Sequence, residues 1–322
     1  MTEAAVSSGR TALLGRLGAE ARPAARSLDA RRALQLALAG VWLLDAVLQY
    51  QPFMYTKAFP QMLAASAAGN PSVIARPIIW DANLIQHHLV PLNTIFATIQ
   101  LLLGLGIALR PTVRPALAAS VAWSLAVWWL GEGFDGILGG TASPVEGAPG
   151  AVILYALLAV LLWPADRRAE APYVAARAVG VRAAQALWLV VWLSLAFFAV
   201  TPVNRAPGAL SGVLTDAAAG EPGWLAALDK GAAAAVAGHG LAAAAALAVA
   251  FFVIALSVLL PRRAAKAVLG LAIVVAALIW VIGQALGMIL ATGATDPNSG
   301  PLLILLALAY WPASAGGTEL AR

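Results

Sequence analysis

The sequence contains no cysteine and few charged residues, and both absences restrict what this chain can be. Without cysteine it can form no disulfide, no thiolate metal site and no thiol–disulfide relay of its own. Only 11% of its 322 residues are charged, whereas soluble domains carry roughly a quarter. Hydrophobic residues make up 61%, and the mean hydropathy is +0.85. The composition excludes an ordinary soluble domain and favours a protein embedded in a lipid bilayer.

Long apolar runs alternate with short polar segments along the whole chain. Alanine and leucine dominate these runs, and the alternating pattern of a membrane barrel is missing, so helices are expected. We predict an all-α polytopic membrane protein with about eight transmembrane helices. The expected spans are 33–50, 84–108, 115–131, 150–163, 183–201, 232–260, 266–290 and 301–313. The fourth and eighth are short for a hydrocarbon core of about 30 Å.

The basic residues predict how the chain lies in the membrane. With eight spans, 16 of the 20 Lys and Arg residues fall on one side, and the other side carries eight acids. Loops rich in Lys and Arg stay in the cytoplasm, so both termini are predicted to be cytoplasmic, in the plasma (inner) membrane. The basic segment 1–32 and the tail 313–322 lie on that side. This placement explains the pI near 10.0 without nucleic acid. The expected partners are the lipid bilayer and a membrane or outer-face protein.

The chain also matches itself at an offset between 148 and 152 residues. The matched pairs, in order, are Trp42 with Trp192, Pro52 with Pro202, Gly69 with Gly220, His87 with His239, Gly131 with Gly283, and Trp163 with Trp311. Because both copies enter from the same side, we predict a parallel repeat of two four-helix units, 33–164 and 183–312.

Each unit has a first helix, a long outer loop, a basic hairpin between its second and third helices, and a Gly/Pro-rich loop before its fourth. With Gly104 and Gly106 near the end of the second helix, this plan resembles the DoxX-like superfamily of four-span membrane proteins, here as a tandem fusion. The resemblance implies a link to quinone or thiol redox chemistry. The missing cysteines speak against the thiol version.

Polar residues inside the expected spans are concentrated in the first unit. Asp45 matches Leu195, and Glu132 matches Gln284. Polar groups are costly in lipid and tend to mark function. The second unit therefore has the composition of a scaffold. The candidate ligand-binding residues are Asp45, Gln49, Gln86, His87, His88, Asn93, Gln100, Glu132 and Asp135.

For each candidate a structural role is the alternative. Asp45 could be hydrogen-bonded to a neighbouring helix, and Glu132 with Asp135 could form a hydrated cap beside glycine turns. Asn83, Gln86, Asn93 and Gln100 have spacings that predict one inward-facing stripe on the helix 84–108. His87 and His88 point about 100° apart on a helix, and no HxxxH or ExxH spacing occurs, which disfavours haem or copper.

Three functions remain open on the sequence alone. The first is a non-catalytic subunit or scaffold that binds lipid or quinone in an outward-facing cavity of the first unit. The second is a small-solute or proton-coupled transporter, and the third is a redox or metal-dependent membrane enzyme component. Transport usually needs helices broken near the midplane in both repeats, and no catalytic triad, phosphate loop or dinucleotide motif occurs. The sequence therefore favours the first function and leans against an enzyme.

Overall fold

The computed structural model describes residues 29–165 and 171–313, and these residues form helices without any strand. The predictions for segments 1–28 and 314–322 lie outside the described residues. The helices of the first half are α2 (Ala30–Gln49), α3 (Ala58–Ala65), α4 (Ser72–His87), α5 (Leu89–Ala108), α6 (Val113–Leu130) and α7 (Ala151–Leu161). The helices of the second half are α8 (Val174–Val179), α9 (Val181–Ala199), α10 (Ala209–Ala217), α11 (Gly223–Val236), α12 (Gly240–Ala255), α13 (Arg262–Leu278) and α14 (Ser299–Ala309).

Six of these helical segments are long and apolar enough to cross a membrane. They are Ala30–Gln49, Leu89–Ala108, Arg110–Leu130, Val181–Ala199, Gly240–Leu259 and Arg262–Gly283. The expectation of an all-α fold is thus confirmed for the described residues, and the six segments support a multi-pass membrane protein.

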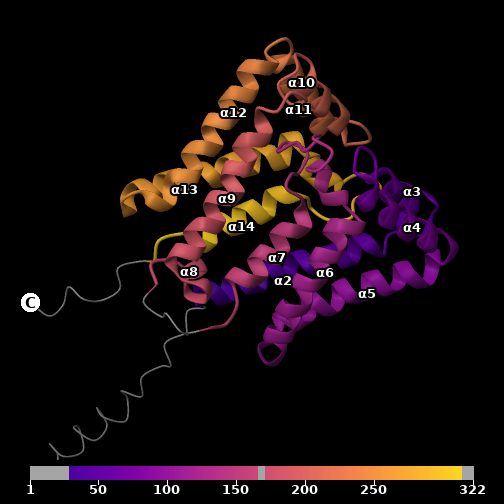
Figure 1. Ribbon diagram of the computed structural model, residues 1–322, viewed down its shortest axis with the longest axis horizontal. Coiled ribbons are helices and arrows are strands. Elements are labelled where there is room, and N and C mark those ends of the chain that lie inside the picture. Colours follow the sequence, from indigo (N-terminus) through magenta and orange to yellow (C-terminus); the bar gives the residue numbers. More distant parts are fainter. Residues whose placement is uncertain (1–28, 166–170, 314–322) are drawn as a thin grey trace, which may run out of the picture.

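The remaining two expected spans correspond to α7 and α14, which are shorter. Each has 11 residues, or about 16 Å of helix at 1.5 Å per residue. Figure 1 shows both helices in the middle of the molecule, where they pack against each other and against α6, α2 and α13. Most of their side chains are buried. A helix shielded by protein in this way need not match the full thickness of the hydrocarbon.

Three expected spans are wrong in their bounds because the backbone leaves the helix. The span 84–108 is interrupted at His88 (φ −126°, ψ 40°), where α4 ends and α5 begins. A continuous helix would drive the ring of Pro91 into the carbonyl of His87. The span 232–260 is likewise broken before Gly240, at Gly238 (φ 75°). The third, 266–290, stops well before its expected end.

α6 and α13 are each followed by an unusual left-handed turn. After α6, φ is positive at the four residues 133–136, including Phe134 (56°) and Asp135 (50°). After α13 and a π-helical turn, φ is again positive at four residues, 285–288, among them Leu286 (58°) and Gly287 (74°). Four successive left-handed residues turn the chain out of the helical path at both places. They direct it into two loops, which we call the α7 loop (residues 137–150) and the α14 loop (residues 289–298).

Candidate functional site

The first half of the molecule contains a partly open cavity of about 350 Å³, within the usual size range of ligand pockets. It lies between α2, α3, α4, α5 and α6, and the N-terminus of α7 and the α14 loop complete it. Its apolar wall includes Phe59, Met62, Leu63, Ile85, Phe96 and Trp123. Its polar lining consists of Asp45, Gln49, Ser66, Asp81, Gln100, Glu132, Thr295 and Asp296. We call it the outer cavity.

Asp45 is the most deeply buried acid of this cavity, with 2% of its surface exposed. Tyr155 of α7 donates a hydrogen bond to Asp45 Oδ2 at 2.5 Å. The tyrosine ring packs on Trp42, with centroids 4.3 Å apart, and the indole N–H of Trp42 donates to Ser120 Oγ at 3.1 Å. This chain of contacts fixes one oxygen of Asp45. The other, Oδ1, is buried and has no hydrogen-bond partner.

Gln49 and Asn93 satisfy each other where α2 crosses α5. The Gln49 side-chain amide donates to Asn93 Oδ1 at 2.5 Å, and the Asn93 amide donates to the Gln49 carbonyl at 3.0 Å. Asn93 is fully buried behind the cavity wall, whereas Gln49 also lines the cavity. Their pairing meets the cost of burying two amides, so it accounts for both residues structurally.

Glu132 holds the start of α7 with one oxygen only. Val152 donates its backbone N–H to Glu132 Oε1 at 3.3 Å. In the second half, Gly300 at the start of α14 donates in the same way to Gln284 Oε1 at 3.1 Å. A neutral glutamine therefore suffices for this cap. The difference lies in the second atom: Gln284 Nε2 donates to Ser299 Oγ at 2.8 Å, whereas Glu132 Oε2 is buried without a partner.

Several carboxyl groups of the cavity share an unfavourable environment for negative charge. Burial, together with Asp135 and Asp296, raises the pKa of Glu132 well above its usual range. Burial also raises the pKa of Asp81 and of Asp296. Among the described residues that line the outer cavity, none is Lys, Arg or His, so no cation of the wall offsets these acids.

Asp296 reaches the outer cavity from the second half of the chain. Its Oδ1 accepts the backbone N–H of Asn298 at 2.7 Å, and its Oδ2 accepts the Thr295 hydroxyl at 2.8 Å. The Gln51 amide donates to the Ala294 carbonyl at 2.6 Å and ties the same loop to the end of α2. The α14 loop is therefore part of the first cavity's wall.

The α7 loop makes the opposite crossing, with an apolar result. Val145 packs against Leu214 and Ala233 of the second half, and Asn204 donates to the Ala142 carbonyl at 2.7 Å. The space left beside Val145 is only about 20 Å³. The two halves thus exchange loops, and the space at the corresponding place in the second half is too small for a ligand.

The structure brings some of the sequence candidates together and separates others. Asp45, Gln49, Gln100 and Glu132 line the outer cavity, and Asn93 lies directly behind it. The expected single stripe is wrong because the helix breaks at His88. As a result Asn83, Gln86, His87 and His88 line no part of the outer cavity, and all four are exposed. Asp135 is part of the left-handed turn and does not line the cavity either.

Sequence reasoning missed four polar residues of the lining: Ser66, Asp81, Thr295 and Asp296. Asp81 lies four residues before the buried Ile85 on α4, and this helical spacing could have placed both on one face. Nothing in the local sequence indicates that the α14 loop crosses to the first half. No group of three or more His, Cys, Asp or Glu side chains that could hold a metal ion occurs in the described part of the chain.

Asp135 lends itself to a test of stability against pH. Burial, together with Glu146 and Asp296, raises its pKa to about 7, and its Oδ2 has no partner. The unfolded chain loses this proton near pH 4 and the folded chain retains it. Stability therefore falls as pH rises from about 4 to about 7 and levels off above. We expect Asp135→Asn, which tolerates the positive φ, to raise the melting temperature by several degrees at pH 8 and by clearly less at pH 4.5.

The control for this experiment is Asp216→Asn, which changes an exposed carboxyl on α10. It should leave the melting temperature unchanged at both pH values. If Asp135→Asn shows the same difference from the unmodified protein at pH 4.5 and at pH 8, the carboxyl is not buried as described.

In comparisons with known proteins, no protein-family model, no curated protein and no solved structure matches this chain. Any inference about its function therefore rests on the geometry of the outer cavity.

Proposed function

We propose that this protein is a non-catalytic membrane component that binds an amphiphilic molecule, a quinol or a lipid, in the outer cavity. One observation carries the proposal. Three residues of a largely apolar cavity each have a buried oxygen without a hydrogen-bond partner: Asp45 Oδ1, Gln100 Oε1 and Glu132 Oε2. Leaving such groups unpaired costs about 1–3 kcal/mol each. A ligand that supplies the missing bonds recovers this cost.

The three oxygens define the chemistry of the ligand head. The amide oxygen of Gln100 can only accept, and Asp45 already accepts its first bond from Tyr155. The head should therefore donate hydrogen bonds to Asp45 and Gln100 through hydroxyl or ammonium groups, whereas Glu132, whose raised pKa favours the protonated carboxyl, can donate from Oε2. The absence of cations from the described wall disfavours phosphate and carboxylate heads. The hydroquinone form fits better than the quinone, whose carbonyls only accept.

The wall defines the rest of the ligand. Phe59, Phe96 and Trp123 offer aromatic faces to a ring or an alkyl chain. Ala126 of α6 lines the cavity and is exposed, so a tail can continue outside the cavity there. The ligand is accordingly an amphiphile whose head lies between α2 and α7.

Asp45→Asn and Glu132→Gln test the proposal without changing side-chain volume. Each variant keeps an acceptor for the existing bond, from Tyr155 or from Val152, and replaces the unpartnered oxygen by a donor. We expect Asp45→Asn to weaken binding of a short-chain alkyl hydroquinone at least tenfold, about 1.4 kcal/mol. Glu132→Gln, which replaces a protonated carboxyl by another donor, should weaken binding less. Both are measured by quenching of tryptophan fluorescence. Gln86→Ala, at an exposed position on α4, should bind like the unmodified protein.

The oxidised quinone and a primary alkylamine serve as further probes. The quinone should bind more weakly than the hydroquinone, and preferential binding of the amine would assign the site to an aminolipid head. If both substitutions leave the binding of all probes unchanged while the protein still inserts, the polar cluster is structural and the proposal fails.

We also propose that the fold is an eight-span protein made of two parallel units. Three features support the repeat. The order α2 to α7 recurs as α9 to α14, with α3 and α10 short in both. The two left-handed turns begin 152 residues apart, at Gly133 and Ala285. The caps on α7 and α14 come from Glu132 and Gln284, which are also 152 residues apart.

The starts and ends of the helices α4 and α11 support the repeat as well. Pro71 precedes α4 with φ −55° and ψ 147°, and Pro222 precedes α11 with φ −54° and ψ 143°. Each of these helices is followed by a break, and the residues that cap the next helix, His88 and His239, lie 151 residues apart. This register pairs His239 with His88 rather than with His87. A relation to DoxX-like units is part of the same proposal.

The orientation proposed from the basic residues places both termini in the cytoplasm. Because the chain has no cysteine, single cysteines report on it directly. A cysteine at Gly140 should react with a membrane-impermeant maleimide in intact cells, and one at Arg263 should not. The reverse pattern would overturn the orientation, and labelling of both would overturn the number of spans.

A further inference from the structure

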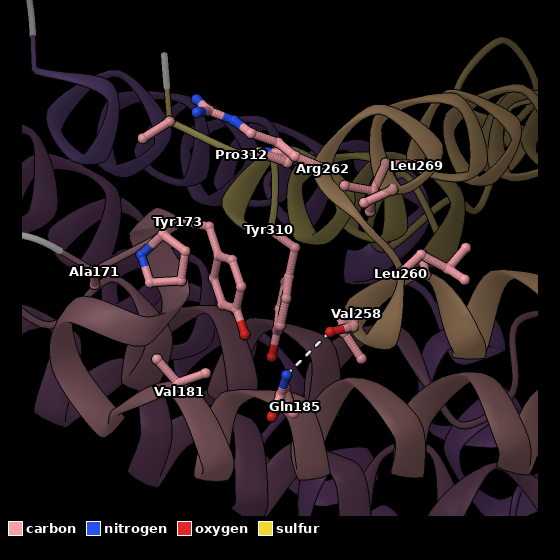
Figure 2. Close-up of a pocket in the computed structure, with 14 residues that line it drawn as sticks. Ala171, Tyr173, Val181, Gln185, Val258, Leu260, Arg262, Leu269, Tyr310 and Pro312 are labelled. Atoms are coloured by element: carbon pink, nitrogen blue, oxygen red, sulfur yellow. Dashed lines mark hydrogen bonds between the residues drawn. The ribbon is translucent and has the colours of Figure 1, made fainter. Parts of the chain in front are cut away.

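A second cavity, of about 410 Å³, lies in the second half of the molecule and shares no residue with the outer cavity. It is bounded by the segment around α8, by α9, by the end of the α12 span, by α13 and by the residues just after α14. Figure 2 shows the rings of Tyr173 and Tyr310 side by side in it, with their hydroxyls directed toward Gln185. We call it the basic-end cavity.

Two hydroxyl groups of this cavity are buried and unused. Tyr173 is 8% exposed and Ser257 is 1% exposed, and neither hydroxyl has a hydrogen-bond partner. Their neighbours are satisfied: Gln185 donates to the Val258 carbonyl at 3.0 Å, and Tyr310 donates to the Ala184 carbonyl. The two unpaired hydroxyls on one cavity are therefore available to donate to an acceptor.

The charge of this cavity is opposite to that of the outer cavity. Arg262, exposed at the start of α13, contributes to the lining, and no acid does within the described residues. It has no ion-pair partner in the described ranges, whereas Arg177 of α8 is paired with Asp29 at 2.9 Å. Burial raises the pKa of Tyr173 to about 12, so its hydroxyl stays protonated and can donate at neutral pH.

The remaining lining is apolar, with Val181, Leu260 and Leu269 among its members. A small anion would leave this wall uncovered. A molecule that combines an anionic head with hydrocarbon uses both parts of the cavity.

We propose that the basic-end cavity binds an anionic phospholipid. The Arg262 guanidinium and the Tyr173 and Ser257 hydroxyls donate to its phosphate oxygens, and the acyl chains lie against the leucine and valine side chains. This site is independent of the proposed function, since it involves other residues and the opposite ligand charge. The head of a lipid at this position would join the starts of α9 and α13.

Native mass spectrometry of the purified full-length protein tests this proposal. The protein is equilibrated with phosphatidylglycerol or with phosphatidylcholine of the same acyl chains. We expect retention of phosphatidylglycerol at least tenfold above phosphatidylcholine, with a rise in melting temperature. Arg262→Ala, and the double substitution Tyr173→Phe with Ser257→Ala, should each reduce this retention at least tenfold. Arg263→Ala removes an adjacent exposed charge that does not line the cavity, and it should retain the lipid.

Each alternative result overturns the proposal. Equal retention of both lipids would show that the head is not recognised. An equal loss in Arg263→Ala would show a diffuse surface charge effect, and equal stabilisation by inorganic phosphate would show an anion site without lipid. Melting temperatures of the lipid-free variants verify that each one is folded. The double substitution removes only the two hydroxyl groups and retains the aromatic ring at position 173.

Discussion

Ala126→Trp should abolish ligand binding in the outer cavity while the protein remains folded. Ala126 lies on α6 at the cavity wall, and its side chain is exposed. An indole at this position, one helical turn after Trp123 and on the cavity lining, takes up volume that the ligand needs. No buried contact is lost, and the added aromatic surface packs against existing aromatic rings. We expect no measurable binding of the alkyl hydroquinone and an unchanged or higher melting temperature.

Ala122→Trp is the matched control, because Ala122 lies one helical turn earlier on α6, is also exposed, and does not line the cavity. It should bind the hydroquinone like the unmodified protein. Together with Asp45→Asn, the pair separates steric from chemical contributions. If Ala126→Trp binds normally, the ligand does not occupy the outer cavity, whatever the polar substitutions do.

The features that depend on local physics can be predicted from the sequence. Apolar runs of about 20 residues predict helices because the backbone must satisfy itself in lipid, and α2, α5, α6, α9, α12 and α13 obey this rule. Asp45 is predicted as a site residue because a carboxyl inside an apolar span needs a partner. That partner, Tyr155, is 110 residues away, and no local pattern indicates it.

The features that the sequence does not predict depend on the backbone or on distant contacts. The amide stripe fails at His88 because Pro91 disfavours a continuous helix there, although the hydrophobic pattern runs through it. The left-handed turns include Phe134 and Leu286, and side chains of this kind rarely adopt positive φ. In the sequence, only the glycines in and beside these two segments indicate a turn.

Among the features of the site, the crossing of the α14 loop into the first half is the one that the sequence predicts least. The sequence groups Asp296 with the outer acids of the second unit, yet the structure places it in the cavity of the first. Such an exchange is decided by the shapes of two packed halves, to which each residue contributes little. Because of this crossing, the second half of the chain contributes to the outer cavity. A substitution in the second half that moves the α14 loop should therefore affect ligand binding, even where the substituted residue does not line the cavity.

Gly287→Ala should destabilise the protein strongly and weaken binding in the outer cavity. Gly287 has φ 74°, and an added Cβ would lie 2.5–2.7 Å from backbone atoms of Pro297. Backbone cannot yield as a flexible side chain can, so the α14 loop must move, and the neighbouring Asp296 moves with it. We expect a fall in melting temperature of many degrees and at least tenfold weaker hydroquinone binding.

Gly140→Ala separates the two contributions to that effect. Gly140 has φ 73°, almost the same conformation, but no atom lies within 4 Å of the added Cβ. It should therefore show only the left-handed backbone cost, about 1–2 kcal/mol, and bind the hydroquinone normally. The difference between the two variants measures the clash with Pro297. Equal melting temperatures would mean that the α14 loop does not rest on the left-handed turn, and normal binding in a destabilised Gly287→Ala protein would remove Asp296 from the site.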